Sequence, residues 1–262
     1  MTKVPILSAL VLVVVPHKLC ITLTPKVAST TLLGFAMELV GEDIGDENPR
    51  KYARKHADRL AEKGLLQRRV LKKNIHTLAE EFPGFKWVAA VRNPYARAAS
   101  AYRSKVHRFA KEHRKGIYLW TGLIKTLKGP KHWDNSRTHA IEAANYISFE
   151  DFLEGLAAGN VETNGHFDRQ STILEIPSVT YDLLLRQERL AEDVASLRRM
   201  VGLDAPDVAA LSEANVTRRG GFDISSLSAR EVALVNAIYA SDFANLGYDM
   251  VDPAAQAMRV LA

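Results

Sequence analysis

The feature that most limits what this chain can fold into is an abrupt change of pattern within residues 19–40. Residues 19–23 read Leu-Cys-Ile-Thr-Leu, a β-forming run with no breaker. Residues 24–29 carry no helical pattern, and apolar side chains then return at helical spacing from Leu32 to Val40. This order predicts a buried strand, a loop and a helix, which is half of a βαβ unit.

The loop at residues 24–31 has the composition of an anion site. It reads Thr-Pro-Lys-Val-Ala-Ser-Thr-Thr. Backbone N–H groups and the positive end of a helix dipole meet where a strand turns into a helix, and Lys26 adds a full charge. The nucleoside-triphosphatase motif G-x-x-x-x-G-K-[ST] is absent. A Ser/Thr-rich helix cap with a surface lysine is the structural alternative, and this segment alone does not separate the two.

A second strand and helix are predicted over residues 85–107. Residues 85–91 read Phe-Lys-Trp-Val-Ala-Ala-Val, and Asn93-Pro94 then suits the start of a helix. Arg92 therefore lies at the carboxyl end of a strand, where α/β sheets bind ligands. Ser100 follows about two helical turns later. An arginine fork with a hydroxyl suits a phosphate monoester.

The remaining pattern extends the alternation of strands and helices, which favours an α/β fold with a mainly parallel sheet. For Arg97, Arg103 and Lys105 a solvated helix face is favoured over ligand contact. The other expected elements are a solvated basic helix at 50–73, short helices and a long loop at 103–137, a capping box opening a helix at 149–156, a strand at 179–185, a helix at 190–201 and a C-terminal helix at 228–243.

Composition narrows the class of protein. The chain has 262 residues, 47% hydrophobic and 25% charged, which suits one globular domain. A net charge of +5 and a pI near 9.2 fit either polyanionic partners or a multiply charged nucleotide. Cys20 is the only cysteine, so an intrachain disulfide and a cysteine zinc cage are excluded, and a reducing cytosol is favoured.

The apolar segment at residues 4–15 needs a separate interpretation. It is shorter than the roughly 20 residues that span a bilayer, and Pro16, His17 and Lys18 interrupt it. No A-x-A-like cleavage site follows. We expect two buried strands at 7–15 and 19–23, joined by a turn, rather than a signal peptide or anchor.

The two loop segments together resemble the carbohydrate sulfotransferases that use 3′-phosphoadenosine-5′-phosphosulfate (PAPS), in particular the family 2 group related to Golgi enzymes that sulfate glycans. The family's 5′-phosphosulfate loop, P-K-x-x-S-T-T, is matched by Pro25, Lys26, Ser29, Thr30 and Thr31. Its 3′-phosphate motif, R-[DN]-P-x-x-R-x-x-S-A-Y-R, is matched from Arg92 to Arg103. Weaker resemblances follow in the same order at residues 148–153, 164–170, 181–193 and 238–248.

Two departures from the family pattern point to a cytosolic or bacterial-type member. Phe167 stands where the family usually has tryptophan, and the cysteines of the extracellular members are missing. We expect a cytoplasmic protein with peripheral contact at the inner face of the membrane.

The resemblance implies an α/β, P-loop-like three-layer fold with a central, mainly parallel sheet flanked by helices, in a single domain over residues 1–262. The nucleotide-binding core is expected at about 19–110 and 175–250, and the acceptor-binding region at about 111–170. The implied activity is metal-independent, in-line transfer of a sulfuryl group from PAPS to a hydroxyl of a carbohydrate or glycoconjugate. The expected partner is a glycan or glycolipid acceptor, with no specific nucleic acid.

The resemblance also implies roles for individual residues. Lys26 is expected to stabilise the departing phosphate, and His166 is the candidate base, because the pKa of histidine suits proton abstraction near neutral pH. A structural histidine is the alternative, and Glu150, Asp151 and His17 are weaker candidates. The expected cofactor-binding residues are Pro25, Lys26, Val27, Ala28, Ser29, Thr30, Thr31, Arg92, Ser100, Arg218, Arg219 and Gly220. No metal ligand is expected.

Two other functions fit parts of the sequence. A nucleotide-dependent kinase would use the same anion loop with magnesium-ATP. A non-enzymatic scaffold would bind polyanions through the basic residues at 50–73 and 103–115. That scaffold would keep salt-sensitive binding after a Lys26→Ala substitution.

Overall fold

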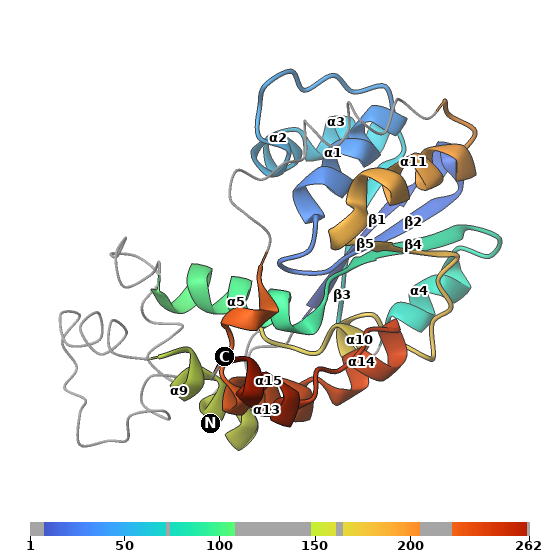
Figure 1. Ribbon diagram of the computed structural model, residues 1–262. Coiled ribbons are helices and arrows are strands. Elements are labelled where there is room, and N and C mark those ends of the chain that lie inside the picture. The colour runs from blue at the N-terminus through green and yellow to red at the C-terminus, as the bar shows by residue number, and fades with distance from the viewer. Residues whose placement is uncertain (1–7, 72–73, 108–147, 161–164, 205–221, 261–262) are drawn as a thin grey trace, which may run out of the picture. The chain divides into compact units, whose positions relative to one another are not determined.

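The computed structural model describes residues 8–71, 74–107, 148–160, 165–204 and 222–260 (Figure 1). The chain divides into two compact units. The first unit comprises Met1–Asn93 and Gln170–Gly220, and the second comprises Pro94–Arg169 and Gly221–Ala262. The single domain expected over residues 1–262 stays a prediction.

The first unit is built on a five-stranded sheet with the order β3-β1-β2-β4-β5. The strands are β1 (Ser8–Val14), β2 (Leu19–Leu23), β3 (Leu65–Leu71), β4 (Lys86–Val91) and β5 (Leu183–Arg186). β1 is antiparallel to both of its neighbours, whereas β2, β4 and β5 pair in parallel. β3 therefore runs in the same direction as β2, and the sheet is mainly parallel, as predicted.

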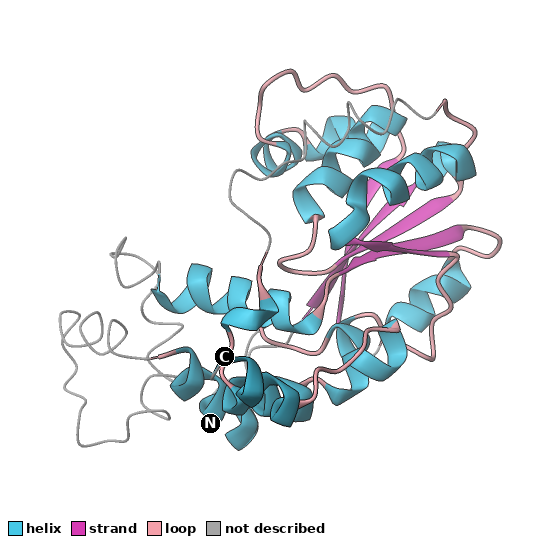
Figure 2. Cartoon of the chain, in the orientation of Figure 1, coloured by secondary structure: helices cyan, strands magenta, loops and turns pink. Residues whose placement is uncertain are grey.

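Helices cover both faces of this sheet and give the first unit three layers (Figures 1 and 2). Successive strand residues point to opposite faces, so Leu12 and Ile21 belong to one buried cluster and Val11 and Cys20 to another. The first cluster includes side chains from α1 (Ser29–Leu39), α2 (Pro49–Lys55), α3 (Ala57–Glu62) and α11 (Leu190–Met200). The second includes side chains from α4 (Ile75–Glu81) and α10 (Gln170–Ile173). The predicted α/β three-layer fold is confirmed.

The described part of the N-terminal apolar segment, from Ser8 onward, forms a buried β-hairpin with residues 19–23, as expected. β1 and β2 pair from Val14 with Leu19 to Leu10 with Leu23. A short 3-10 turn, Val15–His17, and Lys18 in the left-handed region (φ 47°) connect them. No described helix has the length and apolar character needed to cross a membrane.

The prediction of one basic helix at residues 50–73 is wrong. The segment forms α2, α3 and then β3, which is an edge strand. Gly64 ends the helical part with φ +86°, and an added Cβ would lie 2.9 Å from Cδ of Pro16. The strand was missed because it is only partly buried: exposed Gln67, Arg68 and Arg69 interrupt the apolar alternation.

The third predicted strand, at residues 179–185, is shorter and later than expected. β5 begins at Leu183, whereas Val179 is a buried core residue outside the strand. Asp182 lies between them and accepts a hydrogen bond from Trp87 N (2.8 Å). Before β5 begins, the link to β4 is therefore made by the Asp182 side chain rather than by backbone pairing along the whole expected strand.

The second unit is helical and has its own core. It contains α5 (Pro94–Tyr102), a π-helical turn (Arg103–His107), α9 (Phe149–Gly155), α13 (Ala229–Ile238), α14 (Ala240–Leu246) and α15 (Pro253–Val260). The starts of α5 and α9 agree with the sequence analysis. The expected helix at 228–243 is divided at Tyr239, and α15 was not predicted.

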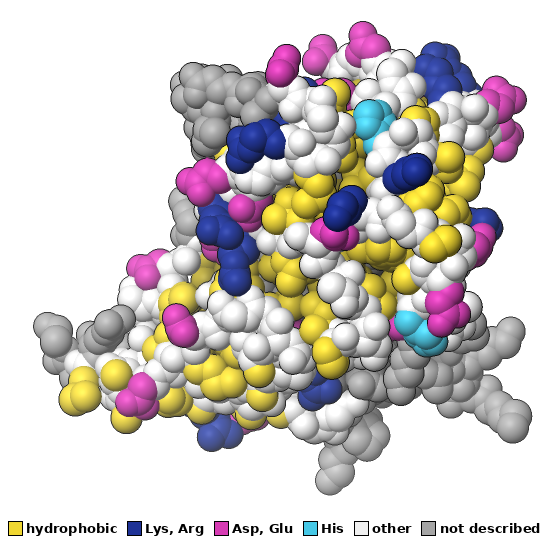
Figure 3. All heavy atoms as spheres, turned by 90° about the vertical axis from the view of Figure 1, so that its right-hand side faces the viewer, with side chains coloured by type: hydrophobic (Ala, Val, Ile, Leu, Met, Phe, Trp, Pro, Cys, Tyr) yellow, Lys and Arg dark blue, Asp and Glu magenta, His cyan; other side chains and the backbone are white. Residues whose placement is uncertain are grey.

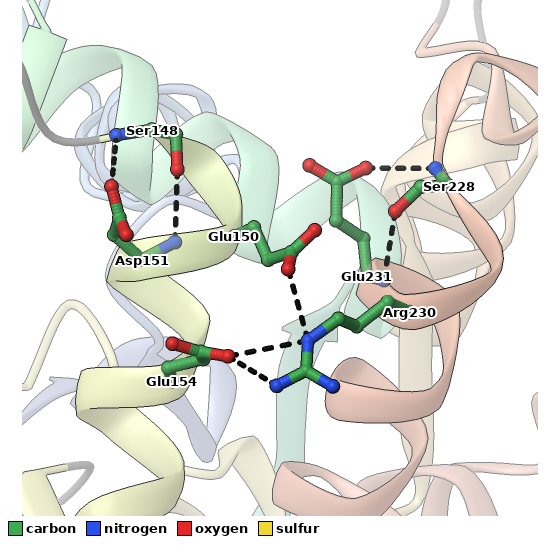
Figure 4. A network of polar contacts seen from close by, with 7 residues as sticks. All are labelled: Ser148, Glu150, Asp151, Glu154, Ser228, Arg230 and Glu231. Carbon is green, nitrogen blue, oxygen red and sulfur yellow. Dashed lines mark hydrogen bonds and ion pairs between the residues drawn. The ribbon is translucent and has the colours of Figure 1, made fainter.

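Two capping boxes fix the starts of α9 and α13 (Figure 4). The Ser148 hydroxyl accepts from Asp151 N, and the Ser228 hydroxyl accepts from Glu231 N (3.0 and 3.1 Å). Arg230 joins the two helices through ion pairs with Glu150 (2.9 Å) and Glu154. These contacts set the position of α13 against α9.

We expect the substitution Ser228→Ala to lower the free energy of unfolding by about 1 kcal/mol, because it removes a helix cap. Urea denaturation followed by circular dichroism measures this change. Ser196→Ala is the matched control, since Ser196 lies inside α11 and caps no helix. An equal loss in both variants would contradict the capping role.

Candidate active site

The predicted anion loop lies at the carboxyl end of β2 and leads directly into α1. Its backbone turns sharply. Lys26 and Ala28 have φ angles of 72° and 37°, and residues other than glycine rarely adopt such positive values. Val27 is buried and anchors the turn. Such backbone conformations are costly and cluster at ligand sites.

The donors of this loop differ in their surroundings. Lys26 and Thr31 are half-buried, Thr30 is exposed and Ser29 is buried. Ala28 precedes the first helical residue and has no polar side chain that could cap α1. The amino end of α1 therefore keeps the partial positive charge that favours an anion.

Arg92 follows β4, the parallel neighbour of β2, so that both predicted phosphate-binding segments leave the same edge of the sheet. Its backbone is held from both sides by the buried side chain of Gln170. Arg92 N donates to Gln170 Oε1 (2.9 Å), and Gln170 Nε2 donates to Arg92 O (2.8 Å). This explains the glutamine in the segment at 164–170 that resembles the family.

Consecutive side chains after β5 brace both segments. Gln187 Oε1 accepts from Ala28 N, and Glu188 Oε1 accepts from Asn93 N, each at 2.8 Å. Asp193 supports this turn by accepting from Arg186 N (2.6 Å). Glu188 and Asp193 belong to a family pattern that is visible in the sequence, whereas Gln187 carries no local signal.

Arg50 is another residue that the sequence analysis did not place in the site. Its guanidinium donates a hydrogen bond to the Ser29 hydroxyl. The start of α2 is thereby held beside the loop.

A buried carboxylate fixes α2 and α3 after α1. Glu42 accepts from the Tyr52 hydroxyl and forms ion pairs with Arg59 (3.0 Å) and Lys63 (2.5 Å). Hydrogen bonds from Lys63 and then Tyr52 lower the pKa of Glu42 to about 2. Glu42 is therefore ionised at neutral pH.

The second unit holds the candidate base, His166, in a braced loop. The buried Arg97 donates to Asp168 O (2.6 Å) and Gly165 O (3.4 Å), on either side of His166. The Tyr239 hydroxyl donates to Phe167 O (2.9 Å). Burial raises the pKa of Tyr239, so its hydroxyl keeps the proton that it donates.

The solvated helix face expected for Arg97 is therefore wrong, because this side chain is 1% exposed. Carbonyl oxygens of a neighbouring loop accept hydrogen bonds from both terminal nitrogens of its guanidinium, which offsets the cost of placing this charge in the core. Arg103 is exposed, as expected, and lies 5.9 Å from the centre of the Phe222 ring.

The weaker base candidates have structural contacts. Glu150 pairs with Arg230, Asp151 belongs to a capping box, and His17 Nε2 lies 3.0 Å from Leu39 O. Ser100 is half-buried in the second unit, and its pairing with Arg92 stays a prediction. Arg218, Arg219 and Gly220 lie outside the described residues, as does most of the expected acceptor region at 111–170.

We expect the stabilising effect of Glu42 to depend on pH. Its folded pKa lies below the unfolded value of about 4.3, so its contribution is complete above that pH and is lost as the pH falls toward 2. Thermal denaturation of the wild type and Glu42→Gln should differ most at neutral pH and converge in acid. A difference that stays constant with pH would contradict the electrostatic explanation.

Of three comparisons with known proteins, only the one with protein-family models gave a match. No curated protein and no solved structure matched the chain. The sequence model described as the sulfotransferase family matches residues 11–249, which include β2 with its loop, Arg92, Gln170 and the bracing turn after β5. The chain therefore belongs to the sulfotransferase family.

Proposed function

We propose that this sulfotransferase takes its sulfuryl group from PAPS and transfers it to a hydroxyl of a glycan or glycolipid. The observation that carries the proposal is the pair of phosphate-binding segments at adjacent parallel strand ends, one containing Lys26 and the other Arg92. Both are braced by the turn after β5. A donor with phosphate groups at two separate positions matches two such segments.

The residues of the loop fit a phosphate ester. Lys26 offers an ammonium group, and Ser29 and Thr30 offer hydroxyls at the amino end of α1. The Thr24 hydroxyl is buried and has no hydrogen-bond partner among the described residues. This set of donors suits an anion better than a neutral ligand.

The mechanism follows from where these charges lie. When bound, the donor supplies the sulfuryl group, whose bond to the 5′-phosphate oxygen breaks as the acceptor oxygen bonds to sulfur. Lys26 and the amino end of α1 stabilise the negative charge that grows on the 5′-phosphate. Arg92 and Ser100 hold the 3′-phosphate. His166 accepts the proton of the acceptor hydroxyl.

The loop that carries His166 is suited to this role. Arg97 and Tyr239 hold the backbone before and after His166, which limits the movement of the base. Rigid placement of a catalytic group lowers the entropic cost of reaching the transition state.

Metal independence, cytoplasmic location and peripheral membrane contact remain part of the proposal. No group of three or more His, Cys, Asp or Glu side chains in the described ranges is arranged to hold a metal ion. On the face drawn in Figure 3, Lys and Arg side chains are interspersed with Asp and Glu rather than gathered in one basic field.

We expect 3′-phosphoadenosine-5′-phosphate, the desulfated donor, to stabilise the protein against heat, and AMP or magnesium-ATP to do so much less. A ligand at 100 times its Kd adds about 2.7 kcal/mol, which a melting curve detects. Arg92→Ala should abolish the preference, because the variant loses the charge assigned to the 3′-phosphate.

Arg199→Ala is the matched control, since Arg199 is exposed on α11, outside the predicted site. Equal stabilisation by magnesium-ATP would favour a kinase. The acceptor class is then tested by incubation with PAPS and a set of oligosaccharides and glycolipids, with mass spectrometry for an added sulfuryl group. Transfer to none of them would contradict a carbohydrate acceptor.

A further inference from the structure

We propose that Arg50 binds the phosphosulfate end of the donor, next to Ser29. This inference rests on the proposed function and adds a residue from outside the two phosphate-binding motifs. Arg50 lies 21 positions after Ser29 in the sequence, at the start of α2.

The contact between the two residues places a positive charge at the anion loop. The Arg50 guanidinium donates to the hydroxyl of Ser29, which is 7% exposed. Arg50 itself is exposed, and it forms no ion pair with a described residue. Among the described residues, therefore, no carboxylate forms an ion pair that would neutralise the charge of Arg50.

The position of Arg50 is fixed by its surroundings. The Asn48 side chain caps α2 by accepting from Arg50 N (3.1 Å) and Lys51 N (3.3 Å). Gly34 on α1 lies beside Pro49, whose Cγ would be in ordinary contact, at 3.6 Å, with a Cβ added at Gly34. Two residues after Arg50, the Tyr52 hydroxyl donates a hydrogen bond to the buried Glu42. These contacts hold the start of α2 against α1, within reach of the loop.

The chemistry of the pair suits a phosphate or sulfuryl oxygen. A hydroxyl that accepts one hydrogen bond can still donate its own proton, so Arg50 leaves the Ser29 proton available for the ligand. A guanidinium has five N–H donors, and only one is used by Ser29. The remaining donors can bind the same anion in the planar geometry that arginine offers to phosphate.

The test compares two probes that differ only at the 5′ position: 3′-phosphoadenosine-5′-phosphate and adenosine 3′-monophosphate. Calorimetry gives the Kd of each for the wild type, Arg50→Ala, Arg50→Lys and Arg54→Ala. Arg54 is the matched control, because it is an exposed arginine one turn along α2 that forms no hydrogen bond or ion pair with a described residue of the loop.

We expect Arg50→Ala to raise the Kd of the bisphosphate about tenfold, the usual effect of losing one hydrogen bond to a charged group. Its Kd for the 3′-monophosphate should be unchanged, Arg50→Lys should recover part of the loss, and Arg54→Ala should match the wild type. Melting curves without ligand confirm that each variant is folded.

Two results would overturn the inference. An unchanged Kd for the bisphosphate in Arg50→Ala would mean that Arg50 does not touch the 5′ end. An equal loss for both probes would mean that Arg50 only supports the loop. In either case wild-type binding of the bisphosphate leaves the proposed function intact, whereas its failure to bind would overturn both proposals.

Discussion

The candidate site depends on one constraint: two loops that leave adjacent parallel strands must keep a fixed separation. Parallel strands bring their carboxyl ends to one edge, but they do not fix the loops beyond it. Here the side chains of Gln187 and Glu188 accept hydrogen bonds from the backbones of both loops. Because the two side chains are consecutive, the turn after β5 fixes the distance between the anion loop and the backbone beside Arg92.

The motif that begins at Arg92 contains two arginines, Arg92 and Arg97, which have different structural roles. Arg92 follows a strand of the first unit, where its backbone is clamped by Gln170. Arg97 is buried in the second unit and holds the loop that carries His166. The boundary between the compact units falls between Asn93 and Pro94, inside the motif. One short stretch of sequence thus contributes to the order of a candidate phosphate-binding segment and of a candidate catalytic loop.

The sequence was sufficient for features that depend on near neighbours. The change of pattern at residues 19–40 identified β2, the loop and α1, and Ser148 with Asp151 identified the start of α9. Both signals lie within short continuous stretches of the sequence. The strand β3 was lost because an edge strand buries few side chains, and its exposed arginines resemble a solvated helix.

The bracing contacts could not have been predicted, for a related physical reason. Gln187 and Ala28 are 159 positions apart, and Arg97 and Asp168 are 71 apart, so no local period links them. The sequence does not distinguish a buried arginine from an exposed one. An arginine side chain is stable in a core only where acceptors such as carbonyl oxygens surround it. The candidate ligand-binding residues could be proposed from the sequence because ligands require particular donors at particular spacing. Their supports could not, because many side chains can accept a hydrogen bond from a backbone N–H. The supports are therefore visible only in the folded chain, where the order of β2, β4 and β5 brings them together.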